Sequence, residues 1–365
     1  MRIVISGGGT GGHIYPALSV AQELRDSGAE VLYIGGYGSV EAELAVEYGF
    51  SFAPISTSPL HRRSVKAVKD LLTNAKGMAE AKRLIKDFGA DAAIGTGGFV
   101  TAPVLMAADS LGLPTMIHEQ NAYPGLANRR LAKKAAKVCL TFRDAAKWFP
   151  ENADLVYTGL PVRPQILAAA EAVPDAAYAE FAIPEDERDI PVLLVTGGSQ
   201  GAQTLNNAIS GAYENLLGQG IRIIHLCGKK NYDELKKRAL EHPRLVLLPY
   251  LERMEYAMAL ADLAVARAGA SFLAEAAVLS LPTLLVPYPY ATNDHQRANA
   301  REFAEAGAAV VVEDSDLTPE KLIAEAGSIL RDKACMEKMK AGAASLAKAD
   351  AAARIAEIAG AIANK

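Results

Sequence analysis

The sequence predicts an α/β fold with two doubly wound, Rossmann-like parallel-sheet domains. The chain has 365 residues, more than one hydrophobic core usually supports, so two domains are expected. Short runs rich in Val, Ile and Leu alternate with helical patterns in both halves, as in parallel strands buried on both faces. A glycine cluster follows an expected strand in three places, which is typical of nucleotide-binding turns.

The expected strands follow one another in two sets. The first half contains RIVIS, EVLYIG, DAAIGTGG, PTMIHE and KVCLTF, and the second contains PVLLVTGG, RIIHLCG, LVLLPY, DLAVARAG and PTLLVP. A helical pattern after each strand makes a series of βα units. Between the sets, the prolines and glycine of TGLPVRPQI interrupt the pattern and indicate a hinge. We therefore expect domains at 1–160 and 161–340, and a terminal alanine-rich helix at 341–365 that packs back on the first domain.

Composition narrows the class of protein. Cys139, Cys227 and Cys335 lie far apart without metal-ligand spacing, which favours buried thiols over disulfides or zinc. No apolar leader and no run of about 18 apolar residues is found, so neither secretion nor a membrane span is expected. Residues 1–165 have 18 Lys+Arg against 15 Asp+Glu, while the remainder has 20 against 27. The basic residues concentrate in 61–90 and 129–137.

The glycine clusters lie at 7–13, 95–99 and 197–202. Such a turn exposes backbone N–H groups at the start of a helix, where an anion is stabilised. A tight turn without a ligand remains the alternative for any single cluster.

Dinucleotide binding is disfavoured although Gly7, Gly9 and Gly12 fit G-x-G-x-x-G. The second strand ends in Gly35 and Gly36 without the acid that would bind a ribose, and no P-loop motif is present. Hydride transfer therefore ranks last. Two nucleotide-type domains with phosphate-binding turns suit a sugar-nucleotide donor and a phosphorylated acceptor.

Seven motifs, in order along nearly the whole chain, resemble the MurG family of bacterial transferases. They are GGGTGGHIYPALSVAQEL, GTGGFVTAP, HEQNAYPGLANRRLA, GLPVR, TGGSQGAQTLN, ARAGASFLAEAA and NDHQRANA. The resemblance implies the GT-B glycosyltransferase fold, with two domains facing across a cleft. It implies transfer of N-acetylglucosamine from UDP-N-acetylglucosamine, with inversion, to the 4-hydroxyl of undecaprenyl-pyrophosphoryl-N-acetylmuramoyl-pentapeptide (lipid I), which forms lipid II for peptidoglycan. No metal or other cofactor is implied.

The resemblance also implies site residues. His13 is the first choice for the general base and Glu119 the second, and the sequence leaves the choice between them open. The expected donor contacts are Thr10, Gly11, Gly12, Asn121, Arg163, Ser199, Leu251, Ala270, Ser271, Glu275 and Gln296. The expected acceptor contacts are His13, Gly97, Gly98, Phe99, His118, Glu119 and Asn128.

Each role has a simpler alternative. His13 and Asn121 could cap helices, and Leu251 could be a core residue. Arg163 is expected at the nucleotide phosphates, with a structural ion pair as the alternative. Glu275 is expected to accept hydrogen bonds from both ribose hydroxyls. Phe99 stands where some family members have tyrosine, so a contact through that hydroxyl is lost here.

The polyprenyl tail of such an acceptor lies in a bilayer, so a protein that uses this acceptor must bind it at the membrane surface. Residues 64–88 place apolar side chains at helical spacing beneath basic ones, and RRLAKKAAK at 129–137 is expected on the same face. An ordinary surface helix is the alternative. We expect a peripheral protein on an anionic membrane, at the cytoplasmic face, with cell-wall or division proteins as further partners. Nucleic acid is not expected, because aromatic residues do not interleave with the basic ones.

Two other functions remain open. One is a different GT-B enzyme, such as a diacylglycerol glycosyltransferase or a UDP-N-acetylglucosamine 2-epimerase. The other is a catalytically silent sensor or scaffold that binds UDP-N-acetylglucosamine without turnover. The presence of His13, Glu275 and Gln296 argues against the silent protein.

Overall fold

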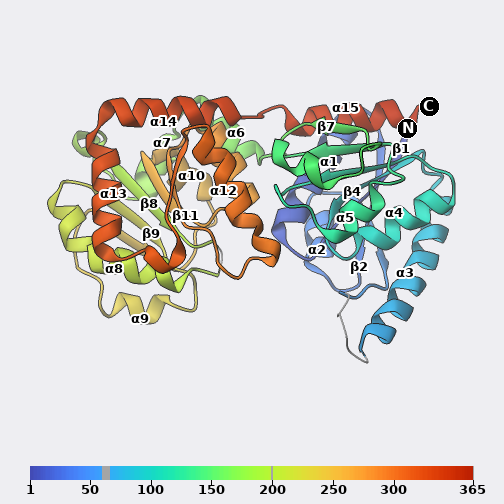
Figure 1. The fold of residues 1–365 in the computed structure, drawn as a ribbon, viewed down its shortest axis with the longest axis horizontal. Coiled ribbons are helices and arrows are strands. Elements are labelled where there is room, and N and C mark those ends of the chain that lie inside the picture. Colours follow the sequence, from blue (N-terminus) through green and yellow to red (C-terminus); the bar gives the residue numbers. More distant parts are fainter. Residues whose placement is uncertain (60–65, 199, 365) are drawn as a thin grey trace. The chain divides into compact units, whose positions relative to one another are not determined.

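The chain forms two compact units. The computed structural model describes residues 1–59, 66–198 and 200–364. One unit comprises Met1–Val162 together with Lys348–Lys365, and the other comprises Arg163–Ala347. We call them unit 1 and unit 2, and Figure 1 labels many of their elements.

The described part of unit 1 is built on a seven-stranded parallel sheet of order β3-β2-β1-β4-β5-β6-β7. The strands are β1 (Arg2–Gly7), β2 (Glu30–Gly36), β3 (Ser51–Ile55), β4 (Ala92–Gly97), β5 (Thr115–Glu119), β6 (Lys137–Leu140) and β7 (Leu155–Tyr157). The direction of winding reverses between β1 and β4, which is where doubly wound sheets bind ligands. Both glycine clusters of this unit follow these two strands.

Helices cover both faces of the unit 1 sheet. They are α1 (Gly11–Asp26), α2 (Val40–Glu47), α3 (Lys66–Phe88), α4 (Thr101–Ser110), α5 (Leu126–Leu131) and α15 (Ala351–Ala363), with a 3-10 helix at Arg143–Trp148. Ile3 and Ile5 of β1 pack against α1 and α15 in one core cluster. Val4, between them, packs in a second cluster with residues of α3 and α4. Alternate side chains thus enter both cores, which explains why the central positions Ile3, Val4 and Ile5 are all apolar.

The described part of unit 2 repeats this plan with a six-stranded parallel sheet of order β10-β9-β8-β11-β12-β13. The strands are β8 (Val192–Thr196), β9 (Arg222–Leu226), β10 (Leu245–Leu248), β11 (Leu263–Ala266), β12 (Thr283–Leu285) and β13 (Ala309–Val311). Its winding reverses between β8 and β11. The glycine-rich segments GGSQGA and RAGAS follow those two strands.

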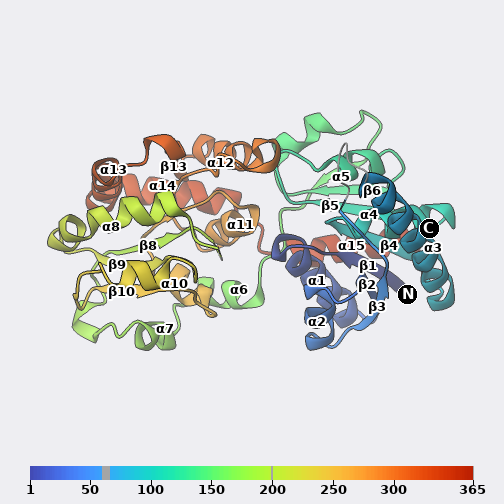
Figure 2. The same ribbon diagram turned by 90° about the horizontal axis from the view of Figure 1, so that it is seen from below.

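The helices of unit 2 form a layer on each side of its sheet (Figure 2). They are α6 (Pro164–Glu171), α7 (Asp175–Glu180), α8 (Gln203–Gly218), α9 (Tyr232–Lys236), α10 (Met254–Leu260), α11 (Ala270–Val278), α12 (His295–Glu305), α13 (Pro319–Arg331) and α14 (Lys333–Leu346), with 3-10 helices at Glu185–Glu187, Thr292–Asp294 and Asp314–Asp316. One core cluster contains residues of α8, α13 and α14, and the other contains residues of α6, α7, α10 and α11.

The alanine-rich C-terminal stretch is two helices, where the sequence suggested one. Ala347 adopts an extended backbone (φ −61°, ψ 137°) and ends α14. Helix α14 belongs to unit 2, whereas α15 packs on α1 of unit 1 through Ile355, Ala359 and Ile362. Across the described residues, no helix combines the length and apolarity needed to span a membrane.

Candidate functional site

The two glycine loops of unit 1 pack backbone against backbone. The N–H of Gly8 donates to the carbonyl of Gly97 at 3.2 Å. A Cβ placed on Gly98 would lie 2.1 Å from the carbonyl oxygen of Gly8, a distance that forbids any side chain. The contact between the two loops therefore requires a glycine at position 98. The exposed remainder of the first loop is Gly9, Thr10 and Gly11, which lead into α1.

His13 lies where these two loops meet. Its Nδ1 is 3.2 Å from the hydroxyl of Thr10, and the hydroxyl of Thr96 donates to its carbonyl oxygen at 2.7 Å. Gly97 gives space to the ring, since a Cβ there would lie 2.6 Å from Cδ2 and 3.0 Å from Nε2 of His13. The hydroxyl of Thr10 and the backbone of Gly97 thus fix the position of the imidazole.

His118 differs from its expected role at an acceptor. Its side chain is fully buried at the end of β5. Burial lowers the pKa of His118 to about 4, so the ring is neutral near pH 7. The Nε2–H donates to the carbonyl of Gly159 at 2.9 Å, and Nδ1 accepts from Gln120 at 3.1 Å. Both nitrogens are engaged within unit 1, so the ring supports the site from behind and is not placed to touch a ligand.

Glu119 is likewise engaged inside the protein. The residue is 2 % exposed, and its carboxylate accepts hydrogen bonds from the backbone N–H groups of Asn121 (3.0 Å) and Gly125 (3.1 Å). Asn128, itself buried on α5, donates to it from Nδ2 at 2.8 Å. Burial raises the pKa of Glu119, and these hydrogen bonds oppose that rise. The arrangement makes Glu119 the anchor of the loop at 121–125, and not an exposed base.

Asn121 and Phe99 remain accessible in unit 1. Asn121 is half-buried in the loop that Glu119 anchors. Phe99 is 39 % exposed and covers Gly9, where a Cβ would lie 3.1 Å from its ring. An apolar ring thus stands over the first glycine loop.

The glycine loop of unit 2 is also closely packed. It connects β8 to α8, and the N–H of Gly201 donates to the carbonyl of Gly198 at 2.9 Å. A Cβ on Gly201 would lie 2.1 Å from the carbonyl oxygen of Cys227, which follows β9. Asn206 of α8 donates to that same carbonyl at 3.0 Å. Ser199, expected at the phosphates, lies outside the described residues.

Unit 2 contains a cavity of about 860 Å³ beside this loop. The predicted residues Arg163, Leu251, Glu275 and Gln296 line it together with Gly198 and Gln200. Ala270 and Ser271 begin α11 between two further lining residues, Gly269 and Phe272. The predicted residues, which are up to 133 positions apart in sequence, from Arg163 to Gln296, therefore meet at one cavity.

Arg163 and Glu275 form a bidentate ion pair in this cavity. Nε of Arg163 donates to Oε1 of Glu275 at 2.7 Å, and a terminal nitrogen donates to Oε2 at 3.1 Å. Burial raises the pKa of the Glu275 carboxyl, while the guanidinium acts in the opposite direction. The structure thus joins two residues that the sequence analysis assigned to separate parts of a nucleotide.

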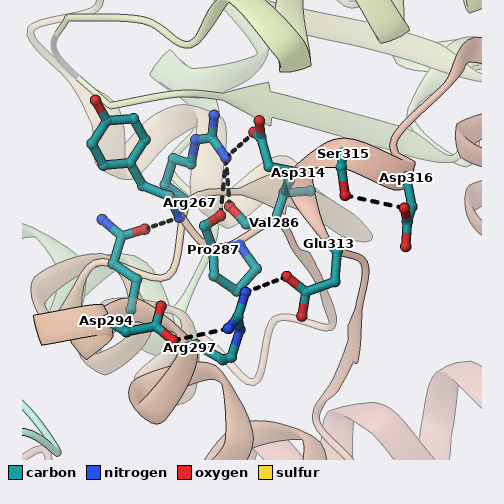
Figure 3. A network of polar contacts seen from close by, with 11 residues as sticks. Arg267, Val286, Pro287, Asp294, Arg297, Glu313, Asp314, Ser315 and Asp316 are labelled. Atoms are coloured by element: carbon teal, nitrogen blue, oxygen red, sulfur yellow. Dashed lines mark hydrogen bonds and ion pairs between the residues drawn. The ribbon is translucent and has the colours of Figure 1, made fainter. Parts of the chain in front are cut away.

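Gln296 is held by a strained turn at the start of α12. Its Oε1 accepts from the backbone N–H of Tyr288 at 3.0 Å, which fixes the orientation of the amide. Asn293 and Asp294 adopt left-handed backbones, with φ of 55° and 54°. Arg297 stabilises this turn by contacts with Asp294 (2.9 Å) and Glu313 (2.6 Å), as Figure 3 shows.

Sequence reasoning missed several residues that line the same cavity, among them Arg267, Tyr288 and Asp314. Arg267 pairs with Asp314 at 2.5 Å and donates to the carbonyl oxygens of Val286 and Pro287 (Figure 3). Its guanidinium carbon lies 5.5 Å from the ring centre of Tyr288. Arg267 opens the segment RAGAS after β11, so its place at the end of a strand was an available signal.

Helix α3 exposes apolar side chains beside basic ones. Val68, Leu71 and Leu72 are 63 %, 59 % and 68 % exposed, and Lys69 and Lys76 are exposed on the same helix. Val65 lies outside the described residues. The helix is held close to the end of β3 at Gly77, where a Cβ would lie 1.8 Å from the carbonyl oxygen of Ser56. The exposed leucines therefore belong to a fixed helix.

No His, Cys, Asp and Glu side chains of the described residues are grouped in a way that could hold a metal ion.

Comparisons with known proteins identify the family. Residues 3–140 match the family described as "Glycosyltransferase family 28 N-terminal domain", and residues 192–355 match its C-terminal domain. The chain is 41 % identical over 350 residues to "UDP-N-acetylglucosamine--N-acetylmuramyl-(pentapeptide) pyrophosphoryl-undecaprenol N-acetylglucosamine transferase" of Halothermothrix orenii, covering 93 % of each. It is 42 % identical to the protein of that name from Desulforamulus reducens, covering 96 % of each.

Solved structures agree with this result. The crystal structure of Acinetobacter baumannii MurG matches with a TM-score of 0.78 and 30 % identity, covering 99 % of each chain. The calicheamicin glycosyltransferase CalG4 matches with a TM-score of 0.71 at 14 % identity, covering 100 % of this chain and 98 % of that chain, which shows the fold alone.

The two parallel sheets and the two matched domains define a family 28 glycosyltransferase of the GT-B class. This confirms the predicted fold class. Within that class, the chain belongs to the MurG family of N-acetylglucosamine transferases. The family predicted from the seven motifs is confirmed.

Proposed function

We propose that this protein transfers N-acetylglucosamine from UDP-N-acetylglucosamine to the 4-hydroxyl of lipid I and so makes lipid II for peptidoglycan. The proposal depends chiefly on one observation: Arg163, Glu275 and Gln296, which the family resemblance assigns to the donor, line one cavity beside the glycine loop of unit 2. The names of relatives at 41–42 % identity describe this same transfer.

We assign donor binding mainly to unit 2. Glu275 would accept hydrogen bonds from the ribose hydroxyls, the backbone at Leu251 would read the uracil, and Gln296 would bind the sugar. The loop that contains Ser199 leads into α8, whose N-terminus favours the pyrophosphate. Ala270 and Ser271 would contribute backbone groups at the start of α11. As the pyrophosphate departs, fixed N–H donors stabilise its growing charge.

We assign the acceptor and the general base to unit 1. His13 would take the proton of the muramoyl hydroxyl as its oxygen forms a bond to C1 of the donor sugar and the bond from C1 to UDP breaks. Attack opposite the leaving group inverts the α-linked donor to a β-linked product. Thr10 orients the ring, and Gly11 and Gly12 offer backbone at the same loop. The buried His118 and Glu119 hold this region, so His13 is preferred over Glu119 as the base.

We assign the remaining expected contacts according to whether each side chain is exposed or buried. Asn121 would reach the donor sugar from the loop that Glu119 anchors. Phe99 and the backbone of Gly97 and Gly98 would border the acceptor, whereas Asn128 would act through Glu119.

We also propose that unit 1 meets an anionic membrane through α3. Exposed Leu71 and Leu72 could enter the interface while Lys69 and Lys76 pair with anionic head groups. A peripheral position at the cytoplasmic face would give access to both substrates, and division or cell-wall proteins are the partners expected there.

Purified protein, radiolabelled UDP-N-acetylglucosamine and a lipid-linked muramoyl-pentapeptide acceptor test the transfer directly. Label should enter the muramoyl lipid and should not enter diacylglycerol offered in parallel. His13→Ala should lower the rate of transfer about a hundredfold or more. Tight binding of UDP-N-acetylglucosamine without transfer to either acceptor would refute the proposal and favour a silent sensor.

A further inference from the structure

Glu41 is a buried acid at the first glycine loop of unit 1, and the family resemblance implies no role for it. It lies in the first turn of α2, shortly after β2, and is 1 % exposed. Its Oε2 accepts from the backbone N–H of Gly9 at 3.3 Å, and its Oε1 accepts from the backbone N–H of Gly36 at 3.2 Å. Because a buried carboxylate needs such hydrogen bonds, Glu41 links the loop after β1 to the end of β2.

Glycines on two segments of the chain make room for the side chain of Glu41. A Cβ on Gly8 would lie 2.5 Å from Oε1 of Glu41, and a Cβ on Gly35 would lie 2.8 Å from its Cγ. Both distances are too short for a real Cβ contact, so a larger residue at either position would displace the carboxyl side chain. The space at the first glycine loop is therefore shaped around this acid.

This arrangement gives the G-x-G-x-x-G pattern a use other than dinucleotide binding. In dinucleotide-binding folds, the second glycine brings the backbone close to the pyrophosphate, and an acid beyond the loop binds the ribose. Here the second glycine of the pattern is Gly9, and its N–H donates to the acid Glu41. The glycine loop and the acid are thus engaged with each other inside the protein.

The loop anchored in this way leads directly to the candidate base. Gly9 is followed by Thr10, whose hydroxyl lies 3.2 Å from Nδ1 of His13. Tyr33 of β2 holds the beginning of the loop, since its O–H donates to the carbonyl of Gly7 at 2.5 Å. Side chains from β2 and α2 therefore fix the backbone that precedes the base.

We propose that Glu41 is a positioning residue for sugar transfer, whose carboxylate fixes the first glycine loop and so places Thr10 and His13 for the acceptor hydroxyl. The carboxylate acts as an internal anion of the loop and touches neither substrate. The inference rests on the proposed function, because it takes His13 as the base and unit 1 as the unit that binds the acceptor. It assigns a role to a residue that lies outside the seven motifs.

Glu41→Gln tests this inference, and Glu43→Gln is the matched control. Glu43 lies in the same first turn of α2 but is exposed, so its variant makes the same change of charge away from the loop. The amide of Glu41→Gln has one acceptor oxygen instead of two, so one of the two backbone N–H groups loses its partner.

Three measurements would be made on the same samples. The first is amide hydrogen exchange of Gly9 and Gly36, followed by NMR on protein with isotope-labelled glycine. The second is kcat/KM for a water-soluble muramoyl-pentapeptide acceptor. The third is the Kd and the stoichiometry of UDP-N-acetylglucosamine binding, by isothermal titration calorimetry.

The expected result separates positioning from a general loss of folding. In Glu41→Gln, Gly9 or Gly36 should exchange about tenfold faster or more, as expected when a hydrogen bond to a charged group is lost. The acceptor kcat/KM should fall about tenfold or more, because the base is misplaced. The Kd of the donor should change by less than about twofold at full stoichiometry, since the donor cavity lies in unit 2. Glu43→Gln should behave like the wild type in all three measurements.

Gly8→Ala disturbs the same contact from the opposite side. Its Cβ would displace Oε1 of Glu41 without removing the carboxylate, so the acceptor kcat/KM should fall even if Glu41→Gln folds poorly. In the Glu41→Ala background, where this carboxyl group is absent, Gly8→Ala should cause a smaller further loss than it causes in the wild type.

Other outcomes separate the two proposals. A wild-type acceptor kcat/KM in Glu41→Gln would overturn the inference, as would a fall in kcat/KM without faster exchange of Gly9 or Gly36. A fall in kcat/KM that only equals a fall in donor stoichiometry would also overturn it, because part of the protein would then be unfolded. If the wild type transfers no sugar while exchange changes as expected, the proposed function is overturned and Glu41 remains the anchor of the loop.

Discussion

Gly97 lies directly against the imidazole of His13. A Cβ at Gly97 would be 2.6 Å from Cδ2 of that ring, so the second glycine loop of unit 1 sets where the base candidate can stand.

Gly97→Ala should therefore lower kcat by displacing His13. A misplacement of about 1 Å can reduce a rate about a hundredfold, and we expect a loss of that order with an unchanged KM for the donor. Gly112→Ala is the matched control, since Gly112 also has a positive φ (76°) but no atom within 4 Å of the added Cβ. Steady-state transfer assays would compare the two. Equal losses in both variants would mean that backbone strain, and not His13, explains the effect.

Glu119→Gln should damage the loop that Glu119 anchors. The new amide would place an N–H donor against N–H groups that now donate to the carboxylate, so the free energy of unfolding should fall by about 1–3 kcal/mol. Urea unfolding and kcat/KM would be measured on the same samples. Glu80→Gln is the comparison. Glu80, on α3, also accepts a hydrogen bond from a backbone N–H, that of Ser56 at 2.6 Å, but it does not belong to the loop that Glu119 anchors. It should lose stability without losing transfer to a water-soluble acceptor. A large fall in kcat for Glu119→Gln at unchanged stability would instead identify Glu119 as the base.

Acid should weaken the fold through His118. Its pKa is lowered by burial to about 4, below the usual value of 6.5, so the unfolded chain binds a proton that the folded chain does not. The contribution of neutral His118 is complete above pH 6.5 and is lost as the pH falls toward 4, at about 1.4 kcal/mol per pH unit. His118→Gln should therefore show a shallower decline of unfolding free energy over this window than the wild type. Urea titrations at several pH values measure both slopes, and identical slopes would contradict the assignment.

Leu72→Glu on α3 should weaken binding to anionic vesicles by at least about tenfold, since it replaces an exposed aliphatic side chain with a charge that anionic lipids repel. Val46→Glu on α2 is the control, because Val46 is similarly exposed, at 64 %. Vesicle co-sedimentation measures both. If both variants bind like the wild type, α3 is not the membrane surface.

Ten strands of the two sheets were predictable because each is a local run of apolar residues, whereas the edge strands β3, β7 and β13 were not among the expected runs. A run such as RIVIS faces apolar helices on both sides, and the glycines after β1, β4 and β8 mark where a strand turns into a helix. The break at Ala347 was missed because alanine-rich sequence on both sides is equally helical.

The site was less predictable because its geometry depends on distant contacts. Nothing near His118 in sequence shows that the carbonyl of Gly159 will accept a hydrogen bond from its ring, and Arg163 meets Glu275 across 112 positions. Motifs identified the residue types, whereas burial decided which of them face a ligand. Arg267 and Asp314 show the same limit, since their pairing depends on the strand order β11-β12-β13, which brings the ends of distant strands together.

The return of α15 to unit 1 has a consequence for biosynthesis. Ile355, Ala359 and Ile362 complete a core whose other members come from the first strands and helices of the chain. A ribosome must therefore synthesise all of Arg163–Ala347 before this core can close. At about 5–20 residues per second, that delay is on the order of ten seconds or more. During that interval the nascent unit 1 exposes the apolar side of α1 that α15 will later cover.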